Sequence, residues 1–187
     1  MLLEFHGSKS GVTEQSALFG EIAATHGGSD FEWATRAEDR SALWAMRHHA
    51  YWAILAARPG CKAVVTDVCV PISKLSEAIE TCRRDLENAG IDGPILGHVG
   101  DGNFHAILMF DPNDEHEKER VLIASERLVD LALSLGGTVT GEHGIGMGKL
   151  GYMTREHGRG WAMMGAIKHA FDPKNILNPG KLVPPRN

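Results

Sequence analysis

One dipeptide, Asp101-Gly102, constrains the fold of this 187-residue chain more than any other feature. It separates two strand-like runs that are rich in apolar side chains, residues 95–100 and 103–110. Asp-Gly is favoured in two-residue hairpin turns because both central residues of such a turn adopt positive φ angles. The two runs are therefore predicted to pair as an antiparallel hairpin, and a purely parallel, doubly wound sheet fits the chain poorly.

Strand-like segments alternate with amphipathic helical segments along the rest of the chain. Further strands are predicted at residues 2–6, 31–36 and 63–70. Helices are predicted at about 13–25 and 38–57, from a cap at Ser73 to Gly90, from a cap at Asp114 or Asn113 to Gly136, and at 157–171. Five strands with intervening helices and a hairpin indicate an α+β fold, a mostly antiparallel sheet with helices packed on it. The length fits one domain of residues 1–187, since domains average roughly 150 residues.

Charge and cysteine content exclude several partners and environments. Lys plus Arg number 19 and Asp plus Glu number 24, so the net charge of −5 provides no basic surface for nucleic acid. The longest apolar stretches, 50–57 and 161–167, fall far short of the ~20 residues of a membrane span. Three cysteines without paired spacing predict no disulfide framework. These features predict a cytoplasmic protein, at most peripheral to a membrane, without nucleic-acid partners.

The predicted hairpin brings two of the ten histidines together. If residues 101 and 102 form the loop, opposed positions sum to 203, and His98 lies directly opposite His105. Opposed side chains share one face of the sheet with Cβ atoms about 5 Å apart, so two imidazoles can meet one divalent cation. An inert, hydrogen-bonded pair of histidines at a sheet edge explains the same two residues, and a third ligand is needed to favour a metal.

The glycine-dense loop at 141–148 supplies a third candidate ligand. Glu142 and His143 lie between Gly141 and Gly144, which allow the backbone to approach a ligand closely. Two histidines and a glutamate leave open coordination positions, as is typical of a catalytic metal site. Adjacent side chains diverge in an extended loop, so one of the pair can bind metal while the other transfers protons.

Arg47 lies on the predicted apolar stripe of helix 38–57, between Leu43 and Ala50. A guanidinium in that position is costly to desolvate unless it is paired, and a bound carboxylate would pair it. A side chain that extends to the edge of the stripe, or one that pairs with a protein carboxylate, explains Arg47 without a ligand. Arg47 is therefore a candidate for binding a carboxylate substrate.

Six segments of the chain, taken together, resemble a known family. GHVGDGNFHAIL, GTVTGEHGIGMGKLGYM and AIKHAFDPKNILNPGKL, in this order, resemble the C-terminal region of FAD-linked 2-hydroxy-acid dehydrogenases of the vanillyl-alcohol-oxidase superfamily. LLEFHGS, LWAMRHHAYWA and TDVCVPISKL are similar to the cytochrome-type D-lactate dehydrogenase branch. The resemblance implies a ferredoxin-like cap or substrate domain over residues 1–187, with a C-terminal helical segment and without the family's N-terminal FAD-binding domain.

The resemblance also implies roles for the candidate residues. The implied metal ligands are His98, His105 and Glu142, and the metal is usually zinc. His143 would take the hydroxyl proton of the substrate while a hydride passes to FAD, and Arg47 would bind the substrate carboxylate. Asn178 and Lys181 match a family segment that lies near the flavin.

Partners and limits follow from the same resemblance. The substrate would be a small D-2-hydroxy acid such as D-lactate, because Ile107 stands where relatives acting on hydroxyglutarate carry asparagine. FAD would be bound mainly by a separate domain or subunit, and electrons would pass to an acceptor such as a cytochrome or quinone. The 187 residues alone are expected to be inactive and, through an uncovered apolar face, to form homo-oligomers. A metal-dependent hydrolase and a non-catalytic metal-binding remnant are the alternatives that the residues leave open.

Overall fold

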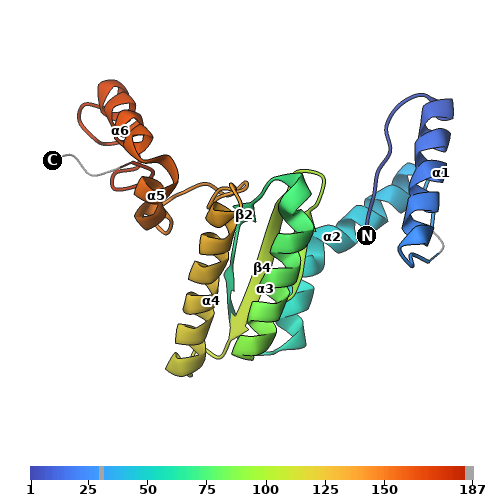
Figure 1. Cartoon of the computed structure of the whole chain (residues 1–187), viewed down its shortest axis with the longest axis horizontal. Coiled ribbons are helices and arrows are strands. Elements are labelled where there is room, and N and C mark those ends of the chain that lie inside the picture. Colours follow the sequence, from blue (N-terminus) through green and yellow to red (C-terminus); the bar gives the residue numbers. More distant parts are fainter. Residues whose placement is uncertain (30–31, 184–187) are drawn as a thin grey trace. The chain divides into compact units, whose positions relative to one another are not determined.

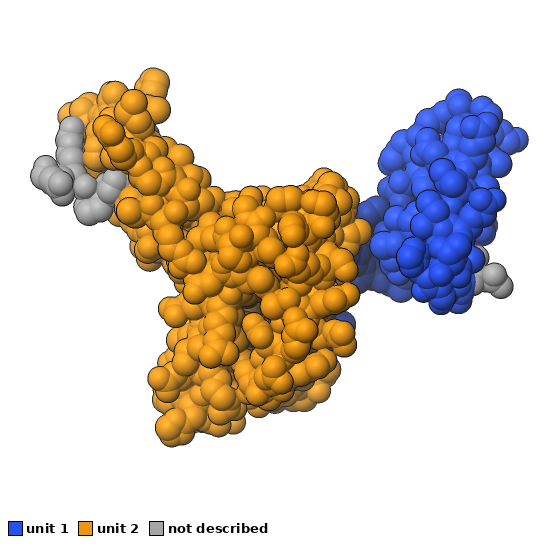
Figure 2. Space-filling model, in the orientation of Figure 1, with its two compact units in different colours: residues 1–53 blue, residues 54–187 orange. Residues whose placement is uncertain are grey.

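The computed structural model of the chain describes residues 1–29 and 32–183. The chain divides into two compact units, Met1–Ala53 (unit 1) and Ile54–Asn187 (unit 2), which Figure 2 distinguishes by colour. None of the described helices combines the length and the apolar character that crossing a bilayer requires.

Unit 1 consists of helical structure without a sheet among its described residues. Helix α1 (Lys9–Thr25) begins after Ser8, whose Oγ accepts a hydrogen bond from the Gly11 N–H, and α2 (Ala37–Ala57) continues across the division into unit 2. The strands predicted at 2–6 and 31–36 are wrong: residues 2–6 and 32–36 are not strand, and Phe31 lies outside the described residues. Apolar and aromatic residues alone do not make a strand, because a strand needs a neighbour for its backbone hydrogen bonds.

Unit 2 contains the sheet and the remaining helices (Figure 1). In chain order its elements are β1 (Lys62–Val65), β2 (Val68–Cys69), the 3-10 turn η1 (Ile72–Lys74), α3 (Leu75–Ala89), β3 (Ile95–His98), β4 (Asn103–Phe110), α4 (Glu115–Ser134), the 3-10 turn η2 (Leu150–Tyr152), α5 (Met153–His157) and α6 (Arg159–Phe171).

Strand β4 is the centre of the sheet, and its three neighbouring strands all run antiparallel to it. β1 and β2 lie on one side in a single continuous register, interrupted at Thr66 and Asp67, and β3 lies on the other side. Helix α3 therefore connects two parallel strands across β4, and an isolated bridge from Cys69 to Thr138 marks the outer edge beyond β2. This order is that of a split βαβ, ferredoxin-like unit, so the predicted α+β fold with a mostly antiparallel sheet is confirmed.

The core lies between the sheet and the helices α3 and α4, which contact each other (Figure 1). All eight residues of β4 are buried, and alternate ones, Phe104, Ala106 and Leu108, pack in this core. Because side chains alternate along a strand, Asn103 and His105 belong to the opposite face of the sheet. β4 therefore separates the hydrophobic core from the face that carries the candidate ligands.

The hairpin exists, but its predicted register is wrong by two residues. His98 lies opposite Asn103, and Leu96 lies opposite His105, so the loop comprises the four residues 99–102. Gly102 has a positive φ of 76°, whereas Asp101 does not, and the Asp101 N–H donates to the His98 carbonyl at 2.9 Å. A shift of two positions keeps every side chain on its own face. His98 and His105 therefore share one face, as predicted, although they are diagonal rather than opposed.

Helix ends in unit 2 follow the sequence signals in part. Asp114 caps α4 by accepting from the His116 and Glu117 N–H groups, and Gly90 ends α3 in the left-handed conformation, both as predicted. Ser73 is not the cap of α3, which begins after the turn η1. The last predicted helix, at 157–171, corresponds to α6. Gly158, whose φ of 51° favours glycine, separates α6 from the short helix α5, which was not predicted.

Candidate metal centre

The interruption between β1 and β2 orients the imidazole of His105. At Thr66 the side-chain Oγ1, instead of the carbonyl, accepts from the Ala106 N–H at 2.7 Å. The Thr66 carbonyl is then available to His105, whose Nδ1 lies 3.0 Å away. A carbonyl can only accept, so Nδ1 carries the proton of the neutral ring and Nε2 presents a lone pair. This is the arrangement in which a second hydrogen bond fixes a metal-binding histidine.

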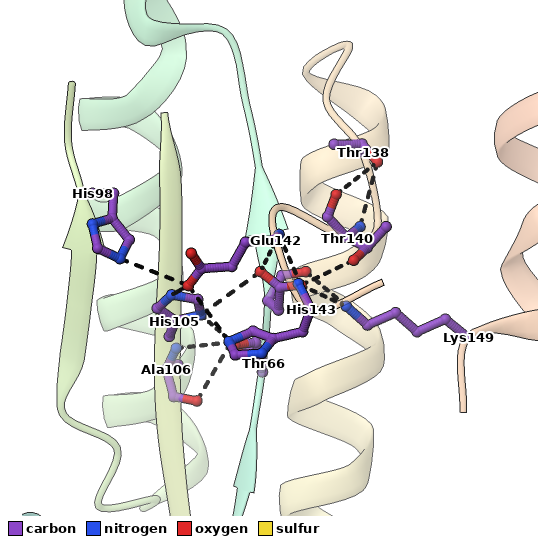
Figure 3. Close-up of polar contacts among 10 residues, drawn as sticks. Thr66, His98, His105, Ala106, Thr138, Thr140, Glu142, His143 and Lys149 are labelled. Atoms are coloured by element: carbon purple, nitrogen blue, oxygen red, sulfur yellow. Dashed lines mark hydrogen bonds and ion pairs between the residues drawn. The ribbon is translucent and has the colours of Figure 1, made fainter. Parts of the chain in front are cut away.

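Glu142 brings a carboxylate to that lone pair (Figure 3). Its Oε1 lies 3.0 Å from His105 Nε2, 3.7 Å from His98 Nε2 and 3.5 Å from His143 Nε2. The lone pairs of His105 Nε2 and Glu142 Oε1 face each other at 3.0 Å, which is favourable only with a proton or a cation between them. Four donor groups thus converge on one small volume.

The spacing of these donor atoms fits a tetrahedral ion. Metal bonds of 2.0–2.2 Å at tetrahedral angles separate neighbouring donor atoms by roughly 3.3 Å. The donor atoms of His98, His105 and Glu142 lie within 4.8 Å of one another. The distances from Glu142 Oε1 to His105 Nε2 (3.0 Å) and to His98 Nε2 (3.7 Å) lie on either side of roughly 3.3 Å. Nitrogen and oxygen donors in this ratio suit zinc and similar divalent ions. The residues present therefore fit a divalent metal.

Asp67, which the sequence analysis missed, anchors the loop that carries Glu142. Its carboxylate accepts from the backbone N–H groups of Glu142 (3.2 Å) and His143 (2.9 Å), from Thr140 Oγ1 (3.0 Å) and from Lys149 Nζ (3.2 Å). Burial raises the pKa of Asp67, but the His143 N–H and the Lys149 charge outweigh it and hold this pKa at about 2. The available signal was an acidic residue inside the valine-rich run 63–70, where a charge is costly unless it is paired.

The remaining predicted site residues lie in other parts of the chain. Arg47 is half-buried on α2 and lines a hollow of about 900 Å³ inside unit 1, together with Trp33 and Trp44. Asn178 and Lys181 lie in an exposed turn after α6, where the Lys181 N–H donates to the Asn178 carbonyl at 3.3 Å. The group that the structure brings together consists of His98, His105, Glu142 and His143.

Relatives of known name match almost the whole chain. It is 50% identical over 184 residues, 98% of its length, to "Probable D-lactate dehydrogenase, mitochondrial" of Danio rerio. It is 41% identical over 186 residues to D-lactate dehydrogenase (cytochrome), mitochondrial, of Arabidopsis thaliana, and 38% identical over 159 residues to D-lactate dehydrogenase (cytochrome) 1, mitochondrial, of Saccharomyces cerevisiae. These matches cover 99% and 82% of this chain. The chain spans about a third of each relative: 37%, 33% and 27% of their lengths.

The names of these relatives overturn the cytoplasmic prediction. All three are mitochondrial proteins by name. The prediction used three cysteines without paired spacing and the lack of an apolar stretch as long as a membrane span, and neither feature distinguishes the cytoplasm from an organelle with reduced thiols.

A solved structure and a family model agree on the fold. 4-Ethylphenol oxidase from Gulosibacter chungangensis, in complex with isoeugenol, superimposes with a TM-score of 0.67 over 97% of this chain and 38% of that chain, at 19% identity, which supports a shared fold. The model of the FAD linked oxidases, C-terminal domain, matches residues 1–182. With this match and with relatives at up to 50% identity, the chain belongs to the family of FAD linked oxidase C-terminal domains.

Proposed function

We propose that this chain is the substrate- and metal-binding part of an FAD-dependent D-2-hydroxy-acid dehydrogenase that acts on D-lactate or a similar small acid. Family membership supports the flavin, and the names of the relatives support the substrate. FAD would be bound mainly by a domain or subunit outside these 187 residues, and the electrons would pass on to a cytochrome or quinone. The reaction converts a 2-hydroxy acid to a 2-oxo acid, releasing a hydride to FAD and a proton.

The metal site is the observation on which the proposal depends. His98, His105 and Glu142 would hold the ion, because the lone pairs of His105 Nε2 and Glu142 Oε1 face each other at 3.0 Å. A divalent ion such as zinc would supply Lewis-acid polarisation of the substrate hydroxyl. The buried imidazole of His105, fixed by the Thr66 carbonyl, would give this site its orientation.

His143 would accept the hydroxyl proton. Its side chain is 64% exposed, so it can meet a substrate, while its backbone N–H is anchored on Asp67. An imidazole suits this role because its ordinary pKa is near neutrality. Two adjacent residues would thus have different roles: Glu142 would bind the ion, and His143 would transfer the proton.

Arg47, Asn178 and Lys181 would complete the active site. Arg47 would pair with the substrate carboxylate, since a guanidinium forms two parallel hydrogen bonds with such a group. Asn178 and Lys181 would contribute to the flavin environment. Asn178 has a φ of 46°, a conformation that asparagine tolerates better than most residues.

Metal analysis tests the site directly. The purified chain, treated with chelator and then supplied with Zn²⁺ or Mn²⁺, is expected to bind about one ion per molecule. The double variant His98→Ala/His105→Ala should lose this ion. Full occupancy in the double variant would show that the ion is bound elsewhere.

Flavin reduction tests the reaction. In a chimera, this chain would replace the matching segment of the Danio rerio relative, and D-lactate should reduce the bound FAD. His143→Ala should slow that reduction about 10²–10⁴-fold, whereas His157→Ala, on α5, serves as the matched histidine control. The 187 residues alone should be colourless after purification; tight, stoichiometric FAD with D-lactate turnover would contradict the proposal, and a chimera that hydrolyses esters without reducing flavin would favour the hydrolase.

A further inference from the structure

We propose that Asp67 is the positioning residue of the metal centre, acting through Glu142. This inference rests on the proposed function, because it concerns the site at which the metal would bind. Asp67 would not touch the metal or the substrate. Its role would be to fix the backbone of the loop, so that the Glu142 carboxylate meets the two histidines.

The hydrogen bonds that the Asp67 carboxylate accepts all come from the loop. The Asp67 side chain is 3% exposed, and its two oxygens accept from the N–H groups of Glu142 and His143 and from Thr140 Oγ1. Lys149, from the far end of the same glycine-dense loop, donates both to the Asp67 carboxylate and to the Asp67 carbonyl, at 3.2 and 3.0 Å. The Asp67 side chain therefore contacts the loop before Glu142, at Glu142 itself and after it.

Asp67 Oδ1 also lies 3.8 Å from His105 Nδ1, and Asp67, His105 and His143 form a second group of donor atoms within 4.8 Å of one another. Because loop donors occupy both Asp67 oxygens and the Thr66 carbonyl accepts from His105 Nδ1, we assign Asp67 to the loop and not to the ion.

Asp67 and its neighbour Thr66 orient two different candidate ligands. The register of β1 and β2 continues unchanged through these two residues, so the interruption contains no inserted residue. Thr66 turns its carbonyl to His105 Nδ1, and Asp67, opposite His105 in the ladder, turns its carboxylate to the loop. A two-residue interruption thus orients one ligand from the strand and another from the loop.

A carboxylate is the group that this position requires. Four donors converge on it, and one of them is the ammonium of Lys149. An asparagine has one accepting oxygen, and its NH₂ group would face a donor wherever it was placed. Asp67→Asn therefore preserves the size of the side chain while leaving loop donors without an acceptor.

Asp172 provides a matched control within unit 2. It is also buried, and it accepts from two successive backbone N–H groups, those of Ile176 (3.0 Å) and Leu177 (2.9 Å), and from the ammonium of Lys168. These contacts resemble those of Asp67, apart from the additional Thr140 hydroxyl at Asp67. The segment that Asp172 holds follows α6 and carries no predicted metal ligand. Asp172→Asn should therefore reproduce the general cost of removing a buried carboxylate without affecting the metal.

The first experiment compares Zn²⁺ affinity, measured by competition with a chromophoric chelator, in the full chain. Asp67→Asn should weaken binding 10–100-fold, the usual effect of losing a group that orients a ligand. Asp172→Asn should change the affinity less than twofold. Equal affinity in the Asp67 variant and the unmodified chain, or equal losses in both variants, would overturn the proposal.

A double-mutant cycle separates positioning from a general loss of stability. In a Glu142→Gln background, Asp67→Asn should weaken binding less than twofold further, because the residue through which Asp67 acts is already changed. The visible absorption of bound Co²⁺ should also shift in the same direction in Asp67→Asn and in Glu142→Gln. Independent, multiplicative losses in the double variant would overturn action through Glu142.

Amide hydrogen exchange in the metal-free chain gives a result that does not depend on metal binding. Asp67→Asn should accelerate exchange at the Glu142 and His143 amides, and Asp172→Asn should instead accelerate it at Ile176 and Leu177. A chain that binds no metal would refute the proposed function, and the exchange data would then decide the role of Asp67 alone. Unchanged exchange at Glu142 and His143 would overturn that role.

Discussion

Units 1 and 2 are stabilised in different ways. In unit 1, α1 and the part of α2 that belongs to it have no buried residue, and a hollow of about 900 Å³ opens among their side chains. In unit 2 all of β4 is buried, and a void of about 10 Å³ between α3, β4 and α4 is about large enough for one water molecule. The side chains of the unit 2 core are thus more closely packed than those of α1 and α2, and the cooperative stability of the chain should originate in unit 2.

The largest expected effect comes from shortening a core side chain in unit 2. Leu108 is 1% exposed and packs in the core from β4. Leu108→Ala should reduce the free energy of unfolding by about 2–5 kcal/mol, through lost burial and the cavity that remains. Urea denaturation followed by circular dichroism measures this. A loss below about 1 kcal/mol would contradict the difference between the units, because the β4 core of unit 2 would then not be the main source of stability.

Helix caps provide the next comparison between the units. Asp114→Ala removes two hydrogen bonds at the start of α4 and should lower the global free energy of unfolding by about 1 kcal/mol. Ser8→Ala removes the hydrogen bond from the Gly11 N–H at the start of α1, together with a hydroxyl–hydroxyl hydrogen bond to Ser10. If unit 1 opens independently, Ser8→Ala should accelerate amide exchange in α1 and leave the global midpoint in urea unchanged; an equal global loss in both variants would show that the units unfold together.

Acid should weaken unit 2 through Glu117. A bidentate hydrogen bond from Arg58 and a further one from the Asp111 N–H lower the pKa of Glu117 from its ordinary 4.5 to about 2. Because the folded-state pKa is the lower one, the contribution is complete above about pH 4.5 and is lost as the pH falls toward 2. Urea midpoints measured from pH 6 to pH 2 should therefore fall, and Arg58→Met should flatten that slope. An unchanged slope in the Arg58→Met variant would show that this ion pair does not cause the loss of stability in acid.

The smallest effect is expected for the unit 1 counterpart of the core substitution. Leu18 lies on α1 and is 58% exposed. Leu18→Ala should change the free energy of unfolding by no more than about 0.5 kcal/mol, the usual range for exposed positions. A loss as large as that of Leu108→Ala would show that Leu18 is buried in the solution state, against a second copy or another partner.

What the sequence could predict also differs between the units. The bounds of β4 and the cap of α4 were predicted correctly from local patterns, because packing in the core favours the same structure as the local sequence does. The strand predicted at 2–6 failed because its local pattern found no neighbouring strand. The predicted hairpin register took no account of Gly102 lying against Val70, the residue after β2. A Cβ at Gly102 would lie 2.0 Å from the Val70 carbonyl oxygen, and such a tertiary contact has no sequence signal.

The candidate ligands could be predicted from the sequence, but the residues that orient them could not. His98, His105 and Glu142 are visible from residue type and from hairpin parity, which survives a register error of two. The roles of Thr66 and Asp67 depend on which backbone groups of β4 and of the loop lie beside them, 39 to 76 residues away in the chain. Only the fold shows those neighbours.

Because β4 carries core residues on one face and a candidate ligand on the other, misfolding of this strand would affect stability and the candidate site together. Phe104 and Leu108 point into the core, and His105, between them in sequence, points to the candidate metal centre. If β4 paired one residue out of register, it would place the imidazole in the core and both large apolar side chains outside it. Such a molecule would lose its stability together with its ligand geometry. Cellular proteases that degrade unstable chains would therefore also eliminate molecules with a misbuilt centre, without any means of sensing the metal.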